Sequence, residues 1–275
     1  MVSIAPQPGF LESAVIRQHL TASINAQLKN LNVAEELPST NQALLDAPIG
    51  PGELWVCLAE HQTAGRGRRG RRWVAPRRSG LCLSIGYGFV SAPAQLAALT
   101  LAIGVSAAGV LKQAGADEVQ LKWPNDLTWR GRKLGGILTE LKRDGQRPPT
   151  VVVGLGVNLA IPPEGLSLQV PQANPPVDLV TICDALPPAS VLAAALVNAI
   201  GATLLHYADS GFSPFRADFA ALDALNGQPV EVTVAEDTVR GVAQGITPEG
   251  LLKIRTETGD TTVMAGDVVM LRPAD

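Results

Sequence analysis

The chain has 275 residues, of which 46% are hydrophobic and 17% charged, and its formal net charge at pH 7 is −3. This length provides for one good-sized domain with a core and a second, small domain. Three isolated cysteines without a CxxC spacing exclude a disulfide framework and fit a reducing compartment. No signal peptide is visible, and the longest apolar run, residues 96–111, is interrupted and shorter than the roughly 20 residues that span a bilayer. We therefore expect a soluble, cytoplasmic protein.

In chain order, residues 11–28 predict one amphipathic helix, an arm packed on the body of the protein. This arm is shorter than a complete helix-turn-helix DNA-binding module. Apolar runs bounded by turn residues then predict a mixture of strands and helices. The expected strands are residues 32–37, 53–60, 81–87, 118–123, 127–129, 133–141 and 150–159, and the expected helices are residues 42–47 and 94–113. We expect the pair 127–129 and 133–141 to form a hairpin around Arg130 and Gly131.

The remaining chain changes character near residue 225. Residues 162–176 are rich in Pro and Asn and predict a surface loop, and residues 188–210 predict a long helix capped near Ser190. A further helix is expected over 212–225. From residue 227 to 271, strand-sized runs alternate with turn residues, which indicates a small β-barrel.

The most unusual stretch is a basic, glycine-rich loop. Seven arginines lie between Arg66 and Arg78, about a third of all 22 Lys+Arg residues. Like charges repel one another, and Gly65, Gly67 and Gly70 add backbone freedom. Guanidinium groups bind carboxylate and phosphate through two parallel hydrogen bonds. We expect a mobile loop that closes over a small polyanionic ligand.

Other interpretations of this loop are less consistent with its surroundings. The GxGxxG spacing matches a dinucleotide fingerprint, but that site needs a helix to begin at the loop, and Trp73 and Pro76 follow instead. A P-loop is excluded because no Lys-Ser/Thr pair follows Gly70. A nucleic-acid-binding patch stays open as an alternative, although no other basic cluster extends it. A solvated charge run would not need the glycines.

Two groups of residues offer ligand contacts at strand or helix ends. KWPND (122–126) ends a strand, where α/β folds often carry ligand groups, and Asp126 is a candidate Mg²⁺ ligand. The alternative is an ordinary Pro-Asn-Asp turn. Ser39 and Thr40 precede helix 42–47, and their spacing favours a helix cap over a ligand contact.

Glycines interrupt two further strands. In RKLGGIL (132–138) they weaken the strand unless something approaches the backbone closely. A flat ligand lying on Gly135 and Gly136, with Lys133 at its charged end, explains this pattern; a bulge with a solvated lysine is the alternative. GLGVN (154–158) repeats the pattern, and Asn158 either caps a strand end or binds a phosphate.

Taken together, AEHQTAGRGRRGRRW (59–73), KWPND, RKLGGIL and GLGVN resemble, in this order and spacing, the motifs of biotin protein ligases. STN (39–41) fits the first ligand-binding turn of that family. The resemblance implies an α+β fold: a catalytic domain similar to class II aminoacyl-tRNA synthetases, with a mixed sheet and helices, followed by an SH3-like β-barrel. The implied divisions are an N-terminal helical extension (1–30), the catalytic domain (31–225) and the barrel (226–275).

The resemblance also implies a reaction. Such an enzyme makes biotinyl-5′-AMP from biotin and ATP, releases pyrophosphate and transfers biotin to one lysine of a biotin carboxyl carrier protein domain. Mg²⁺ acts with ATP; the expected partners include neither DNA nor a membrane, and the protein is a monomer or homodimer. A lipoate ligase of the same fold is the near alternative, and the arginine-rich loop argues against it. The chain lacks the length for the DNA-binding domain of some members, so no repressor role is expected.

The family motifs assign roles residue by residue. Arg68 and Lys133 are the expected catalytic residues. The residues expected at biotin or biotinyl-AMP are Ser39, Thr40, Asn41, Gln62, Gly65, Arg66, Arg68, Lys133, Gly135, Gly136 and Gly156. Those expected at ATP and its phosphates are Lys122, Trp123, Asn125 and Asn158, with Asp126 as the magnesium ligand. The second adenylate loop, about 160–182, has no aromatic residue, so Val170, Leu179 or Val180 are expected to cover the adenine.

Overall fold

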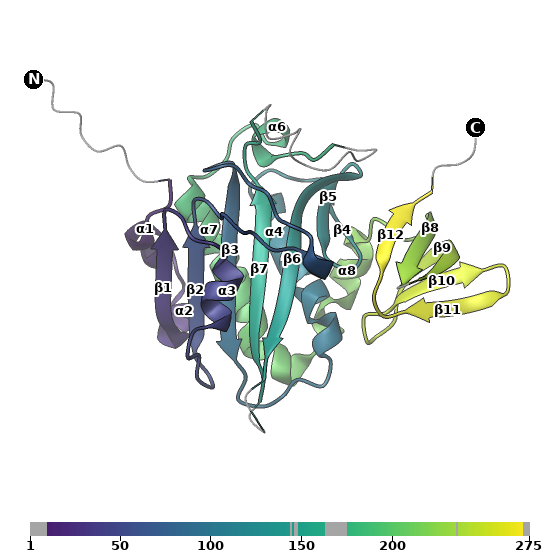
Figure 1. Ribbon diagram of the computed structural model, residues 1–275, viewed down its shortest axis with the longest axis horizontal. Coiled ribbons are helices and arrows are strands. Elements are labelled where there is room, and N and C mark those ends of the chain that lie inside the picture. Colours follow the sequence, from purple (N-terminus) through teal and green to yellow (C-terminus); the bar gives the residue numbers. More distant parts are fainter. Residues whose placement is uncertain (1–9, 144, 146–147, 163–174, 235, 272–275) are drawn as a thin grey trace, which may run out of the picture.

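The structure is a computed structural model that describes residues 10–143, 145, 148–162, 175–234 and 236–271. These residues form two β-sheets (Figure 1). The larger has, in spatial order, β1 (Leu28–Ala34), β2 (Leu54–Ala59), β3 (Gly80–Gly88), β7 (Thr150–Asn158), β6 (Arg132–Lys142), β5 (Asp126–Trp129) and β4 (Val119–Lys122). β1 pairs with β2 in parallel and the other neighbours pair antiparallel, so the predicted mixed sheet is confirmed.

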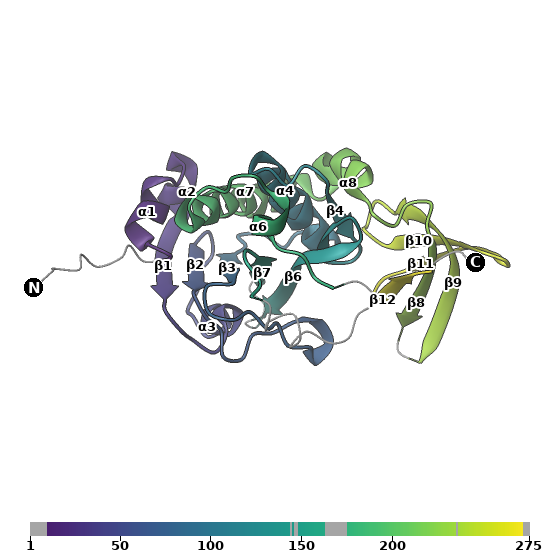
Figure 2. The same ribbon diagram turned by 90° about the horizontal axis from the view of Figure 1, so that it is seen from above.

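Helices cover the two faces of this sheet unequally. Figure 2 shows α4 (Leu99–Gln113), α7 (Ala189–Ser210) and α8 (Arg216–Leu222) on one face and the short α3 (Thr40–Leu45) on the other. Four short helical segments belong to the same part of the chain: η1 (Arg68–Gly70), η2 (Leu96–Ala98), α6 (Leu179–Ile182) and η3 (Ser213–Phe215). One face is thus built as a core, and the other is left for loops.

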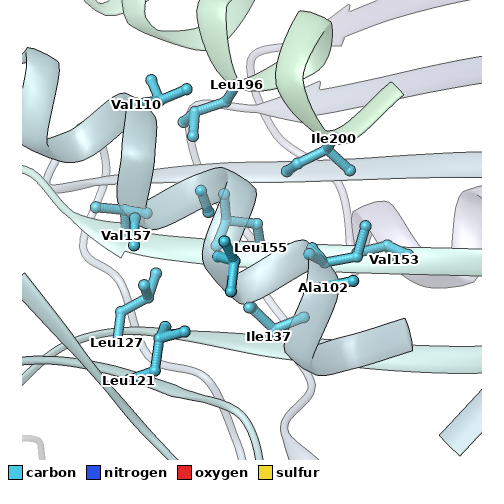
Figure 3. Packing of buried hydrophobic residues seen from close by; sticks show 14 of the residues in the cluster. Ala102, Val110, Leu121, Leu127, Ile137, Val153, Leu155, Val157, Leu196 and Ile200 are labelled. Atoms are coloured by element: carbon cyan, nitrogen blue, oxygen red, sulfur yellow. The ribbon is translucent and has the colours of Figure 1, made fainter. Parts of the chain in front are cut away.

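The alternation of residues in β7 shows why. Val153, Leu155 and Val157 are buried and pack with residues of α4 and α7 such as Ala102 and Leu196 (Figure 3). Between them stand glycines, which point to the opposite face because side chains alternate along a strand. The sequence TVVVGLGVN therefore makes one face apolar and leaves the other without side chains at positions 154 and 156, between Val152 and Asn158.

Two helical stretches, Leu96–Gln113 and Ala189–Ser210, are long and apolar enough to cross a membrane by length and composition alone. The first contains the run 96–111, which was expected to be too short to span a bilayer. In the fold, 61% of the first window and 56% of the second are buried. Packing on the sheet and on each other accounts for their apolar character, as in the core helices of water-soluble domains.

The N-terminal arm differs from the single predicted helix. It forms α1 (Ser13–Gln18) and α2 (Ala22–Gln27), because the Thr21 hydroxyl accepts a hydrogen bond from Ile24 N (3.4 Å) and begins a second helix. β1 then begins at Leu28, opposite Leu54. Residues 28–30, predicted as part of the helical extension, thus belong to the sheet, and the strand predicted over 32–37 lies earlier in the chain.

Most other predicted elements are confirmed, with two local differences. The 127–141 hairpin turns at Arg130 and Gly131, both with positive φ, as a type I′ turn requires. Helix α7 begins after Pro188 with no side-chain cap, because the Ser190 hydroxyl instead accepts from Glu12 N (2.9 Å). The helix predicted over 212–225 ends at Leu222. Most of the predicted loop 162–176 lies outside the described residues.

The C-terminal segment forms the second sheet, as predicted for a small SH3-like domain. Its strands, in spatial order, are β11 (Gly259–Val263), β10 (Leu252–Thr256), β9 (Asp237–Ile246), β8 (Pro229–Val234) and β12 (Asp267–Met270), all antiparallel. It attaches beside β4: Ala224 N donates to Leu121 O (2.9 Å), and the buried Trp123 Nε1 donates to Gly250 O (3.0 Å).

Candidate active site

The register of the larger sheet aligns chemically distinct residues in one row. Lys122 lies opposite Asp126, Asp126 opposite Gly136, Gly136 opposite Gly156, and Gly156 opposite Cys82. Directly opposed residues of antiparallel strands point to the same face. Because the neighbours of Gly156 in β7 point toward α4 and α7, this row faces the other way. It has charged side chains at one end and two glycines in its middle. We call these five residues, from Lys122 to Cys82, the ligand-facing row, after the ligand that the sequence predicts there.

The two glycines of the row serve different purposes. A Cβ on Gly156 would lie 2.5 Å from Trp73 Cε2, so the missing side chain admits the indole ring. A Cβ on Gly136 would lie 3.5 Å from Asp126 Oδ1 and 3.6 Å from Lys133 Nζ, which are ordinary contacts. The protein itself therefore does not require a glycine at 136. The space above this residue lies beside the Lys133 ammonium group, and whether the predicted flat ligand occupies it stays a prediction.

Gly135 lies on the opposite face, contrary to the expectation that the ligand covers both glycines. It is paired with the buried Val157. A Cβ there would lie 2.6 Å from Gly156 O and 3.2 Å from Leu127 Cδ1. Gly135 is therefore required for close packing of β6 on its neighbours.

This difference gives a stability prediction. We expect Gly135→Ala to lower the free energy of unfolding by about 1–3 kcal/mol, because the new methyl group overlaps backbone that cannot move freely. Gly136→Ala is the matched control and is expected to change it by less than about 0.5 kcal/mol. Denaturant unfolding of both variants measures the difference. Equal stability of the two would contradict the assignment of faces.

A charged cluster occupies one end of the row. Lys133 Nζ lies 2.8 Å from Asp126 Oδ1 and 6.0 Å from the centre of the Trp73 ring. Burial lowers the pKa of the neighbouring Lys122, and the charge of Asp126 opposes that shift. Two ammonium groups thus share one carboxylate, which leaves net positive charge for an anionic ligand.

The arginine loop joins this cluster through KWPND. It crosses the face of β7 and β6 (Figure 1), and Arg68 Nη1 donates to Asn125 Oδ1 (3.1 Å). Asn125 Nδ2 in turn donates to Ile137 O (2.8 Å), which ties the turn to β6. Burial lowers the pKa of Arg68. The structure thus brings together two motifs that lie about 55 residues apart in the chain.

Protein carboxylates offset much of the loop's charge. Arg66 Nη2 lies 2.6 Å from Glu140 Oε1, and Asp267 Oδ2 accepts from Arg69 (3.1 Å) and Arg71 (2.6 Å). The predicted self-repulsion is therefore reduced by ion pairs, two of them with Asp267 of the C-terminal sheet. All of these arginines are partly exposed, so the pairs hold the loop weakly and are available for exchange with a ligand.

Ser39 and Thr40 lie at the start of α3, where the predicted helix cap is confirmed for Ser39 and a ligand contact stays a prediction. Ser39 Oγ accepts from Gln42 N (3.4 Å) and caps α3. Thr40 N and Thr40 Oγ1 both donate to Gln62 Oε1, at 2.8 and 3.1 Å. Ser84 Oγ lies 2.6 Å from Thr40 Oγ1. Ser39 thus has a helix-capping contact, whereas Thr40 and Gln62 form a polar group near the ligand-facing row.

Asn41 extends this group toward the arginine loop. Its Nδ2 donates to Glu140 Oε2 (2.9 Å), and its Oδ1 lies 2.6 Å from Ser84 Oγ. A Cβ on Gly154 would lie 2.2 Å from Asn41 Oδ1, so the absence of a side chain at this position leaves room for the Asn41 amide. Glu140 therefore connects Asn41 with Arg66, and the polar group and the loop form one network.

Two residues expected at ATP have structural contacts instead. Trp123 is 2% exposed and its indole nitrogen donates to Gly250 O, so it fastens the C-terminal sheet to KWPND. Asn158 is 3% exposed and its Nδ2 donates to Val177 O (3.1 Å) and Lys133 O (3.3 Å). These contacts explain both residues without a phosphate, and Asn158 fixes the backbone that carries Lys133.

Trp123→Phe tests this structural role. We expect it to lower the free energy of unfolding by about 1–3 kcal/mol, because the carbonyl of Gly250 loses its buried donor. The KM for ATP should stay within about twofold of wild type. Thermal unfolding and steady-state kinetics measure the two effects. A large rise in the KM for ATP at unchanged stability would instead support the prediction that Trp123 contacts ATP.

Some residues of the site were not predicted. Trp73 ends the basic stretch, and its position beside glycine-rich strands was a usable signal. Glu140 lies in an ordinary strand sequence and gave no signal, because its partners are distant in the chain. Of the residues expected to cover adenine, Leu179 is fully buried, Val180 is 61% exposed, and Val170 lies outside the described residues. Exposure favours Val180 for that role.

Comparison with known proteins identifies the type of site. Residues 33–158 match the Biotin/lipoate A/B protein ligase family, and residues 226–271 match the Biotin protein ligase C terminal domain. The biotin--[acetyl-CoA-carboxylase] ligase of Mycobacterium tuberculosis is 34% identical over 252 residues, 89% of this chain and 90% of that protein. The chain belongs to the biotin protein ligase family. The first family match covers every motif of the row and the loop.

Other family members show the same relationship. The bifunctional ligase/repressor BirA of Escherichia coli is 34% identical over 243 residues, 87% of this chain and 73% of that protein. The solved biotin protein ligase from Aquifex aeolicus in complex with biotin and ATP has a TM-score of 0.71 and 25% identity, covering 90% of this chain and 99% of that one. The fold class expected from the sequence is therefore confirmed.

Proposed function

We propose that this protein activates biotin with ATP as biotinyl-5′-AMP, releases pyrophosphate, and transfers biotin to a lysine of a biotin carboxyl carrier protein domain. The observation that carries the proposal is the row in which Trp73 covers Gly156 and the space over Gly136 adjoins Asp126 and Lys133, with Lys122 and Arg68 gathered at the same end. Family membership and a related structure titled with biotin and ATP support it.

The residues suit an attack of a carboxylate on a phosphorus atom. In that step negative charge grows on the non-bridging phosphate oxygens and on the departing pyrophosphate. Lys133, held by Asp126, and Arg68, held by Asn125, are cations fixed before the reaction starts. Donors placed in advance stabilise such charge most effectively, because they need not reorient. No covalent intermediate with the enzyme is required.

Asp126 suits the expected magnesium ion in one respect. Among the described residues, no group of three or more His, Cys, Asp or Glu side chains forms a protein-only metal site. Magnesium in ATP-using enzymes is usually bound through one or two carboxylates together with substrate phosphates. Asp126 beside the cationic cluster fits that mode, and a bound ion would neutralise phosphate charge. The metal remains part of the proposal.

The polar group is proposed to select biotin, and the arginine loop is proposed to protect the acyl-adenylate from water. Thr40, Gln62 and Asn41 offer donors and acceptors to the ring end of a biotin molecule whose carboxylate end lies over Gly136. The acyl-adenylate is labile in water, so closure of the 61–78 loop over the row is proposed to shield it. The acceptor domain, oligomeric state, cytoplasmic location, domain boundaries and absence of a repressor role stay predictions from the sequence.

The experiment that tests the function is ATP–pyrophosphate exchange in Mg²⁺ with either biotin or lipoate. Exchange with biotin alone supports the proposed reaction and substrate. Exchange with lipoate alone would assign the protein to the other branch of the matched family. The absence of exchange with both acids would contradict adenylation. Transfer of labelled biotin to a purified carrier domain tests the second step.

A further inference from the structure

Both ends of the arginine loop meet at one residue, Glu60. This residue follows β2, and its N–H donates to Ala34 O (3.0 Å). Its carbonyl accepts from Arg78 N (2.9 Å) at the far end of the loop. Residues 61–77 therefore leave the sheet at Glu60 and return to it at the same place.

The side chain of Glu60 strengthens this junction. It is 5% exposed, and its Oε2 accepts from Arg78 Nε (2.8 Å), with Arg77 Nη2 at 3.8 Å. Its Oε1 accepts from Leu11 N (3.3 Å) in the N-terminal arm. A buried carboxylate is stable only when its oxygens are paired in this way. Glu60 thus links the arm, the end of β2 and the return of the loop.

Arg78 is the residue that needs this support. Its φ of 62° lies in the left-handed region, which non-glycine residues adopt only when their surroundings fix them. Next to it, Ser79 N and Ser79 Oγ donate to Pro76 O, and Ser79 O accepts from Leu159 N. This turn delivers the chain into β3, two residues before Cys82 of the ligand-facing row.

We propose that Glu60 is a positioning residue for the reaction and acts through Arg78. By fixing the return of the loop, its carboxylate keeps Arg68 and Trp73 over the row before a ligand arrives. This inference rests on the proposed function and extends it to a residue that touches no substrate. When this restraint is lost, the closed loop is less populated. The apparent affinity for substrate then falls in proportion to the fraction of molecules with a closed loop, and the adenylate dissociates faster.

Glu60→Gln is the decisive variant. It keeps the size of the side chain, but the amide group cannot accept from both Leu11 N and Arg78 Nε in the same geometry. We expect the KM for biotin and the release rate of biotinyl-adenylate to rise by about tenfold each, as the population argument predicts. Amides 65–73 should exchange hydrogen faster in the protein without ligand.

Glu35→Gln is the matched control. Glu35 also pairs with the loop, through Arg77 Nη2 at 2.9 Å, but its side chain is 82% exposed. Removing this surface charge should leave KM, adenylate release and hydrogen exchange unchanged. Arg78→Gln should reproduce the effects of Glu60→Gln, and the double variant should add nothing further, because both changes break the same contact.

A purely structural role gives a different result. In that case Glu60→Gln lowers the melting temperature while KM, adenylate release and loop exchange stay at their wild-type values, which would overturn the proposal. If Glu60→Gln does not fold, Arg78→Gln decides the question, because that side chain is half-exposed. Failure of biotin-dependent exchange in the wild type would reject the function instead, and hydrogen exchange would still test the positioning of the loop.

Discussion

Lys133→Ala is expected to reduce biotin-dependent ATP–pyrophosphate exchange by about 10²–10³-fold, the usual effect of removing one pre-placed group that stabilises transition-state charge. Lys133 Nζ lies 2.8 Å from Asp126 Oδ1 and next to Gly136, at the charged end of the ligand-facing row. Its loss removes a cation where charge develops and leaves Asp126 as a repulsive carboxylate. Initial rates at saturating biotin and ATP measure the effect on the chemical step.

Two controls accompany this experiment: the stability of the Lys133→Ala variant and a lysine substitution far from the site. The Asp126 side chain is 26% exposed, so it stays hydrated when its partner is removed, and the variant should fold normally. Lys253→Ala removes an exposed lysine from β10 of the C-terminal sheet and should leave exchange unchanged. A Lys133→Ala enzyme that retained more than a tenth of the wild-type rate would contradict the assigned role.

The alternation of residue types made much of the fold predictable. In β7, apolar residues alternate with glycines, and this pattern predicts a strand with one packed and one open face. The Arg130-Gly131 pair identified the β5–β6 hairpin, because both turn positions need positive φ. The ligand-facing motifs were recognised for the same reason: glycines, lysine and arginine in strands and loops are poorly explained by packing alone.

Details that depend on register were not predictable. β5 and β6 shift register between Leu127 and Thr128, and a shift of one residue exchanges the faces of a strand. Successive residues of a strand point to opposite faces in any register, so the expectation that one ligand covers both Gly135 and Gly136 overlooked this alternation. The observed pairing shows which of the two faces the core, namely Gly135. Local patterns also did not show that Trp123 would find its partner at Gly250, which lies 127 residues further along the chain. Contacts between distant segments decide such roles.

The same limit applies to the charges of the site. The sequence shows a dense group of arginines but not the carboxylates that offset them. Asp267 meets Arg69 and Arg71 across 198 and 196 residues, and Glu140 meets Arg66 across 74. The loop predicted to be mobile has exposed ion pairs along its length and a buried junction at Glu60, and its mobility stays a prediction. Ligand binding then becomes an exchange of ion pairs, which requires less ordering than the folding of a free loop.

Gly136→Ala is expected to raise the KM for biotin by roughly 5–150-fold, the equivalent of the about 1–3 kcal/mol that an extra methyl group costs in a filled space. The new methyl group makes ordinary contacts with Asp126 and Lys133, at 3.5 and 3.6 Å, so the free protein accommodates it. A ligand lying on the strand does not. Because ground state and transition state lose the same contact, kcat should change little.

Isothermal titration with biotin and thermal unfolding separate this effect from damage to the fold. Gly135→Ala should show the reverse pattern, with reduced stability and near-normal affinity in the molecules that remain folded. The two substitutions add the same methyl group to adjacent residues of one strand, so composition and position in the chain cannot explain a difference. Only the face of the sheet distinguishes them. If Gly136→Ala binds biotin with wild-type affinity, the proposal that biotin lies over Gly136 is wrong.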